Sequence, residues 1–362
     1  MNQHEVSFLD VRPARRMTDG RDSHASLSPN LALDDVTGRP IAAACCTALV
    51  LAVYLAAAAL PLATYTTALA TFGLAHVCSE LRYVDYRFGG RLRGGIVPRL
   101  VAGLIAALAV RISGMAGWLP YGTAIVLELT VVAAMTASMV LSMRRFRVAG
   151  AGLAAVLFGG AVLAPLPTFL CLAVAHNLTP LAFLADALDG AERRRVLSIL
   201  AIPFVALPLT LATGLPQALL ASAGLFAPET KVFAGGTLAD NLGAYVSPSY
   251  FDAPWALNVF SAAVFAQCMH YAVVIFVLPR FIEHKAPRRT MLPWPKAPRF
   301  IFLLAAIACA LAVGFTIDYG AARRFYALAA LVHGWIEIPI LVFALDRSSR
   351  ENAGTGFVRR KP

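Results

Sequence analysis

Apolar segments alternate with short polar ones along most of the chain. Each apolar segment has close to the roughly 20 residues that an α-helix needs to cross the hydrocarbon core of a bilayer. The pattern predicts an all-α, polytopic integral membrane bundle of about ten transmembrane helices. The apolar segments are 41–81 (two spans divided at Pro61), 99–118, 121–143, 148–188 (two spans divided near Pro165 and Pro167), 196–215, 255–278, 300–317 and 325–345.

Three stretches lack this pattern. Residues 1–39 are polar and have no apolar core of the kind that a signal peptide needs, so we expect a disordered cytoplasmic tail. Residues 40–346 hold the transmembrane bundle, with a loop at 216–254 that is rich in Gly, Pro, Ser and aromatic residues. Residues 347–362 form a basic cytoplasmic tail. No separate soluble catalytic domain is predicted.

Composition and charge agree with a membrane protein. Hydrophobic residues make up 59% of the 362 residues and charged ones only 14%, too few to cover the surface of a soluble protein of this length. The net charge of +11 would suggest nucleic acid if it lay on one compact face. It lies between the apolar segments instead, which is typical of a topology signal.

The basic residues follow the positive-inside rule. They cluster after the second, fourth, sixth and eighth spans and at the C-terminus, whereas the 216–254 loop sets Lys231 against three carboxylates. Arg323 and Arg324 are the exception. We therefore expect both termini in the cytoplasm, the 216–254 loop outside, and a location in a bacterial inner membrane.

Four histidines lie within predicted spans. His76, His176, His270 and His333 are each the only histidine of their span, and all four spans are even-numbered. Ionisable side chains within a membrane normally face the bundle interior and mark a functional site. Because the even-numbered spans run in one direction, the four imidazoles can meet at one depth.

Two of these histidines precede a glutamate by four residues. His76 is followed by Glu80, and His333 by Glu337. At this spacing both side chains lie on one helical face, where imidazole and carboxylate form a ligand pair for iron, zinc or manganese. The alternative is that each histidine bonds its own glutamate to help the helices pack. We interpret the four histidines and the two glutamates as metal ligands.

Other polar residues beside these positions are candidates to hold the ligands in place. Gln267 and Tyr271 flank His270, Asn177 follows His176, and Tyr83 and Asp85 follow Glu80. Histidine ligands usually give their second ring N–H to such partners.

Arg111 and Glu128 are the remaining charges within spans. Each lies about eight residues from the turn between the third and fourth spans, so both are at one depth. We predict a structural ion pair, with a role along the substrate path as the alternative.

Common enzyme motifs are absent from the sequence, including His-Glu-x-x-His, the Gly-Lys-Ser/Thr loop and Gly-x-Ser-x-Gly. Single histidines on separate spans resemble the bacterial carotene-cleaving dioxygenases related to the bacteriorhodopsin-related-protein family. These are polytopic proteins whose histidines hold a non-haem iron. The two His-x-x-x-Glu pairs depart from an all-histidine site. Haem A synthase is a second resemblance, with single histidines on four helices, but the 216–254 loop has no cysteine.

Three functions are compatible with these residues. The first is a membrane metalloenzyme with one or two irons that oxidises or cleaves a lipophilic substrate, such as a carotenoid or another lipid, with an electron donor as a possible partner. The second is a haem protein for electron transfer or haem modification. The third is a transporter coupled to protons or metal ions. Zinc is the alternative metal. We expect membrane lipids as partners, and we expect no nucleic-acid partner.

Overall fold

The computed structural model describes residues 40–92, 95–143, 146–283 and 290–355, and within them it contains helices and connecting turns but no strand. The tail predicted at 1–39 lies outside these ranges. The α-helices are α2 (Pro40–Ala59), α3 (Pro61–Phe88), α4 (Ile96–Met115), α5 (Tyr121–Val140), α6 (Arg147–Leu163), α7 (Pro165–His176), α8 (Thr179–Ala187), α9 (Gly190–Ala201), α10 (Leu207–Ala212), α11 (Leu215–Ser222), α12 (Leu238–Leu242), α13 (Ala256–Ala272), α14 (Arg280–Glu283), α15 (Ala297–Ile317) and α16 (Tyr319–Thr355).

Prolines begin several of these helices. Pro61 opens α3 and Pro165 opens α7, so the two predicted divisions of the long apolar segments are confirmed. Proline suits the first turn, where its missing N–H has no helical acceptor to serve. A third break, at Asn177 and Leu178, bends α7 against α8 by 47°. The sequence analysis did not predict this bend.

Among the described residues, six helices are long and apolar enough to cross a membrane, and the bent pair α7–α8 makes seven if it is one span. The apolar parts of α2 and α6 are shorter, and α3 is not among the six. Large apolar side chains cover the outer surface, for example Leu163 at 85% and Ile317 at 80% exposure. Exposed apolar surface of this extent indicates contact with lipid.

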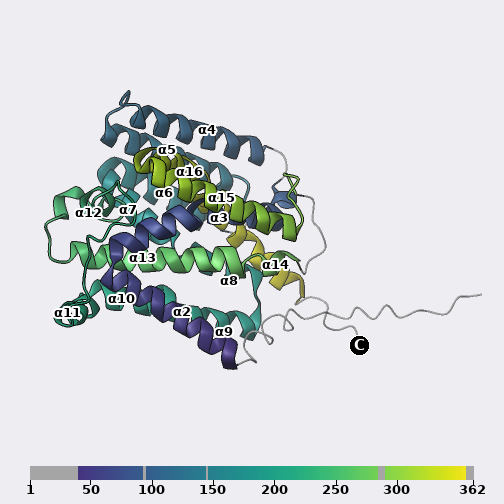
Figure 1. Ribbon diagram of the computed structural model, residues 1–362. Helices are drawn as coiled ribbons and strands as arrows, with labels where there is room; N and C mark the ends of the chain where they lie inside the picture. The colour runs from purple at the N-terminus through teal and green to yellow at the C-terminus, as the bar shows by residue number, and fades with distance from the viewer. Residues whose placement is uncertain (1–39, 93–94, 144–145, 284–289, 356–362) are drawn as a thin grey trace, which may run out of the picture.

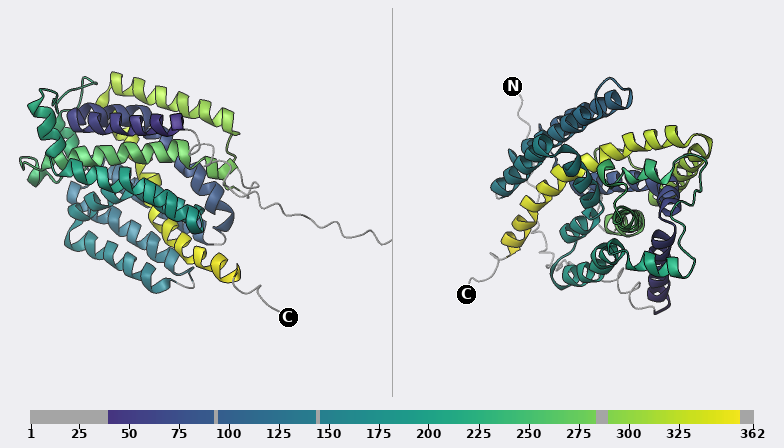
Figure 2. Two further views of the ribbon diagram at one scale, coloured as in Figure 1. Left: turned by 90° about the horizontal axis from the view of Figure 1, so that it is seen from below. Right: turned by 90° about the vertical axis from the view of Figure 1, so that its left-hand side faces the viewer.

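Helix α13 lies at the centre of the bundle. It packs against α2, α3 and α10, and its green ribbon is seen end on in the right-hand view of Figure 2. Helix α16 packs against α3, α4, α5, α8 and α15. Helices α11 and α12 lie at one end of the molecule and α14 at the other (Figure 1). We call the first of these the loop end.

Two predicted boundaries differ from the structure. Helix α16 begins at Tyr319 and runs to Thr355, so it starts before the predicted span at 325–345 and continues into the segment predicted as a tail. The 216–254 loop contains α12, which begins with a capping box: Thr237 Oγ1 accepts from the N–H of Asp240, whose carboxylate accepts from the N–H of Thr237. Such local hydrogen bonds stabilise a helix too short and polar for apolar periodicity to reveal.

Candidate metal centre

Helices α3 and α16 each contribute one histidine and one glutamate to a buried cluster. His76 and Glu80 lie one turn apart on α3, and His333 and Glu337 one turn apart on α16. All four side chains are at most 2% exposed. The two helices pack against each other, so the predicted one-face arrangement brings both pairs to the same place.

His176 reaches the cluster from a broken helix. It is the last residue of α7, and its backbone carbonyl accepts a hydrogen bond of 2.8 Å from the Thr179 hydroxyl at the start of α8. A helix end leaves carbonyl groups without helical partners, and this hydroxyl satisfies one of them. The break therefore places an imidazole at the bundle interior without leaving that carbonyl unpaired.

His270 lies just before a second irregularity, the π-helix η4 (Val273–Val277) that continues α13. Ser79 of α3 donates a hydrogen bond of 2.9 Å to the carbonyl of Val274. Single-turn π segments in α-helices occur frequently at functional sites. Here the serine joins α3 to α13 close to the histidines that each helix carries.

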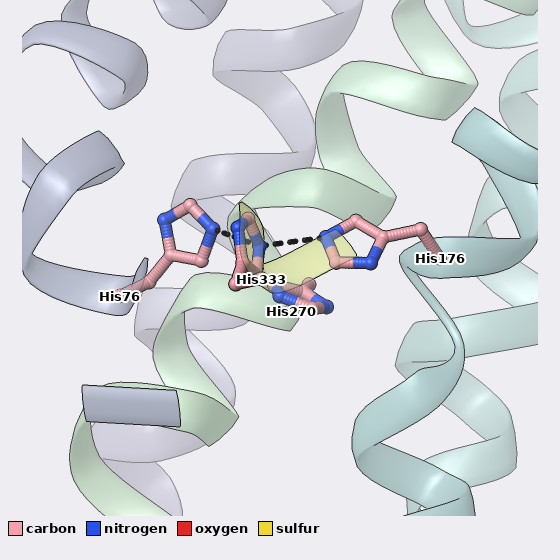
Figure 3. Close-up of side chains that lie close together, drawn as sticks. All are labelled: His76, His176, His270 and His333. Carbon is pink, nitrogen blue, oxygen red and sulfur yellow. Dashed lines mark hydrogen bonds between the residues drawn. The ribbon is translucent and has the colours of Figure 1, made fainter. Parts of the chain in front are cut away.

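The four imidazoles converge on one point. Nε2 of His333 lies 3.1 Å from Nε2 of His76 and 3.2 Å from Nε2 of His176. Figure 3 shows His333 between these two rings, with His270 beside them. One nitrogen from each of the four histidines lies within 4.8 Å of the others. The convergence predicted from the even-numbered spans is confirmed.

The two glutamates lie beside the imidazoles, and one oxygen of each lies within 4.8 Å of a nitrogen of His333, so these three residues form a second candidate metal group. Oε2 of Glu337 is 2.7 Å from Nδ1 of His176, and Oε2 of Glu80 is 3.4 Å from Nε2 of His270. The ion-pair partner of each carboxylate is thus a histidine of another helix. Glu337 accepts the second N–H of His176, the usual arrangement in carboxylate–histidine–metal sites.

Several polar atoms of the cluster have no hydrogen-bond partner within the described residues. Of ten such buried side-chain atoms, six belong to the cluster: Oε1 and Oε2 of Glu80, Nδ1 and Nε2 of His270, Nδ1 of His333 and Oε1 of Glu337. Each buried unsatisfied group costs about 1–3 kcal/mol. Such a concentration in one place is relieved by a group outside the chain, such as a bound ion or ordered water.

A single cation fits the donor set. Two imidazole nitrogens bound to one ion at about 2.1 Å lie roughly 3.0–3.4 Å apart, which matches the two short Nε2 separations. Hydrogen bonding between histidines explains them less well, because one ring nitrogen carries either one proton or one lone pair and His333 Nε2 faces two neighbours.

The residues predicted to hold the ligands in place divide into two groups. Tyr271 stacks on His76 with ring centroids 4.0 Å apart, and Gln267 donates a hydrogen bond to the Tyr271 hydroxyl. Asn177 is buried at the α7–α8 break and donates to the carbonyl of Ala173. These three remain beside the cluster.

The other two predicted residues serve different contacts. The carboxylate of Asp85 accepts from the backbone N–H groups of Met291 and Leu292 and from Nε1 of Trp294. The Tyr83 hydroxyl donates to the carbonyl of Phe183 on α8. Both lie on α3 beyond Glu80, and their hydrogen bonds join the helix to neighbouring segments instead of orienting an imidazole.

A cavity of about 650 Å³ borders the cluster. His76, His176 and His333 line it together with many leucine and alanine side chains. The volume is in the range of small-molecule sites. The sequence analysis missed Tyr326, which also lines the cavity. Tyr326 lies seven residues before His333 on α16, and this spacing places both residues on one helical face.

Arg111 and Glu128 form the predicted ion pair. Arg111 donates from Nε and Nη2 to the two carboxylate oxygens at 2.9 and 2.6 Å, and Nε1 of Trp335 donates to the same carboxylate at 2.6 Å. A second cavity, of about 1020 Å³, lies towards the loop end, and both cavities are lined by Arg111, Phe169 and Ala327. The ion pair therefore lies where the two cavities meet.

No protein-family model, curated protein or solved structure matches this chain.

Proposed function

We propose that this protein is an integral membrane metalloenzyme that holds a non-haem iron and oxidises or cleaves a lipophilic substrate. His76, His176, His270 and His333 are the ligands. Glu80 and Glu337 supply further carboxylate oxygens beside His333, and Glu337 also orients His176. The substrate, a carotenoid or another lipid, lies in the cavity that borders three of the imidazoles.

One observation supports this proposal above the others. Four imidazoles from four helices converge within 4.8 Å, and six buried polar atoms of the same cluster lack hydrogen-bond partners in the described chain. Histidines that only help helices to pack would be expected to satisfy one another, as in ordinary buried polar networks. A cation accounts for the convergence, and a cation that also takes carboxylate oxygens from Glu80 and Glu337 accounts for most of the unsatisfied atoms.

The donor set favours a bare ion over haem. A haem iron accepts protein ligands only at its axial positions, so one haem engages at most two of the four histidines. Imidazole and carboxylate suit both iron and zinc. Iron is preferred because the cluster borders an apolar cavity, and a non-haem iron with an open coordination position can activate dioxygen for an attack on a hydrocarbon.

The protein's own groups perform the remaining tasks. Apolar side chains such as Leu157 and Leu172 bind the lipophile and exclude water from the cavity. Glu337 holds the His176 ring so that its Nε2 points into the cluster. An electron-donor protein is a partner if the reaction consumes external electrons.

The membrane topology belongs to the same proposal. Adding the bent pair α7–α8 and helices α2, α3 and α6 to the six apolar helices brings the number of spans to ten. Both termini then lie on one side, which we assign to the cytoplasm of a bacterium by the positive-inside rule.

The test is elemental analysis with an absorption spectrum on detergent-purified full-length protein. We expect about one iron per chain, retained during treatment with a chelator, and no Soret band. His333→Ala should lower bound metal at least tenfold. The protein should stay folded, because the nine other proposed spans still hold the bundle. Asn241→Ala is the matched control, since Asn241 is equally buried but bonds Tyr319 near the loop end.

Each other outcome contradicts the proposal. A Soret band indicates a haem protein. Metal that leaves readily with the chelator indicates a transporter, in which ions are in transit. Protein with neither metal nor haem, and with an unchanged His333→Ala variant, shows that the histidines only join helices.

A further inference from the structure

A chain of three tyrosines and one glutamine runs along the wall of the cavity beside the histidine cluster. The Tyr245 hydroxyl donates to Oε1 of Gln267 at 2.7 Å, and Nε2 of Gln267 donates to the Tyr271 hydroxyl at 2.6 Å. The Tyr271 and Tyr326 hydroxyl oxygens lie 3.0 Å apart. All four residues line the cavity. We call them the tyrosine chain.

The tyrosine chain has one more hydroxyl proton than it has hydrogen bonds donated by hydroxyl groups. Three hydrogen bonds join the four groups, and a glutamine placed inside the chain donates one of them through its amide. The hydroxyl groups therefore donate only two. Three phenols carry three hydroxyl protons, so one proton has no acceptor in the chain, whichever way the bonds run.

The spare proton belongs to Tyr271 or Tyr326. Their hydroxyl oxygens face each other, and either hydroxyl can be the donor of the bond between them. Tyr271 is 4% exposed and stacked on His76, whereas Tyr326 is only partly buried. We assign the unused donor to Tyr326, because it is the phenol that a ligand in the cavity reaches more easily.

Two other donors of the same wall already have acceptors. Thr179 donates to the carbonyl of His176, and Trp335 donates to Glu128. A hydroxyl proton in an apolar cavity without an acceptor is unfavourable by about the value of one hydrogen bond. A ligand that supplies one oxygen acceptor removes this cost.

We propose that the cavity binds an apolar molecule with a single oxygen acceptor, a carbonyl or hydroxyl group, which receives a hydrogen bond from the Tyr326 hydroxyl. The hydroxyl of Tyr326 contacts that of Tyr271, whose ring stacks on His76. The oxygen-bearing end of the ligand therefore lies near the metal centre. That this ligand is the substrate rests on the proposed function, but its binding to the cavity needs no metal.

A matched pair of ligands tests this preference. Farnesal and β-farnesene share a 15-carbon isoprenoid skeleton, and only the aldehyde has an oxygen. Their affinities for the detergent-purified full-length protein are measured by equilibrium dialysis, with metal content determined on the same sample. One hydrogen bond corresponds to about a tenfold difference in affinity, so we expect farnesal to bind about tenfold more tightly.

Tyr326→Phe removes the hydroxyl and keeps the ring, so it should abolish the preference for farnesal without weakening β-farnesene. Tyr54→Phe is the control, because it also removes a hydrogen-bonded hydroxyl, the one that contacts Thr210, but does not line the cavity. Equal affinities for the two ligands, or a preference that survives Tyr326→Phe, overturn the proposal. A protein without metal that still prefers farnesal through Tyr326 supports this proposal while the proposed function fails.

Discussion

The hydrogen bond between Glu337 and His176 offers the sharpest test of the metal centre. Glu337→Gln keeps the size of the side chain and a carbonyl oxygen that can still accept from Nδ1 of His176. It removes the negative charge. A bond that only joins α16 to the end of α7 should survive this change, whereas a bond that strengthens a metal ligand should not.

The structure sets the size of the expected effect. The Glu337 carboxylate is 1% exposed and lies 2.7 Å from Nδ1, so water screens its charge very little. Replacing a carboxylate that orients a histidine ligand lowers metal affinity about 10- to 100-fold, which corresponds to about 1.4–2.8 kcal/mol. We expect a change in this range, with little loss of thermal stability in the metal-free protein.

The assay is competition for the bound metal against a chelator of known affinity. Asp85→Asn is the matched control, because Asp85 is also a buried carboxylate but accepts from the backbone N–H groups of Met291 and Leu292, away from the histidine cluster. Equal metal affinity for Glu337→Gln and the parent protein would refute the reasoning. So would an equal loss in both variants, since it would report a general effect of charge removal.

Two further predictions concern the ion pair and the topology. Arg111→Met and Glu128→Gln should each lower stability by about 3 kcal/mol and the double variant by less than their sum, because a lone buried charge costs more than none; purely additive losses in thermal unfolding would contradict a coupled pair. Reporter fusions within 216–254 should lie outside and a fusion at the C-terminus inside, and the reverse result would remove the proposed orientation.

The breaks between helices and the membrane character were predictable because they depend on local chemistry. Pro61 and Pro165 each open a helix where the proline was seen to divide an apolar segment. Apolar residues within spans need no specific partner to be stable in lipid, so composition alone reveals them. The bend at Asn177 was missed although it has the same local cause, since Pro180 lies in the first turn of α8 and has no N–H for the carbonyl of His176.

The histidine cluster was partly predictable. A buried imidazole in lipid is costly, so His76 and His333 could be assigned to the bundle interior from the sequence. The partner of each carboxylate could not: Glu337 lies beside His333 as expected, but its carboxylate bonds His176 of α7. Spacing along one helix defines a face, but the groups that this face meets depend on the packing of other helices.

The sequence by itself determined that the chain is an apolar helical bundle with ionisable groups turned inward. These properties follow from the cost of placing charge and unpaired backbone groups in hydrocarbon, which every residue meets independently. Tertiary structure alone decided that Tyr245, Tyr271 and Tyr326 form one hydrogen-bonded chain and that Asp85 binds the 290–294 segment. Hydrogen bonds reach only about 3 Å and depend on direction, so they exist only once distant helices have been placed against one another.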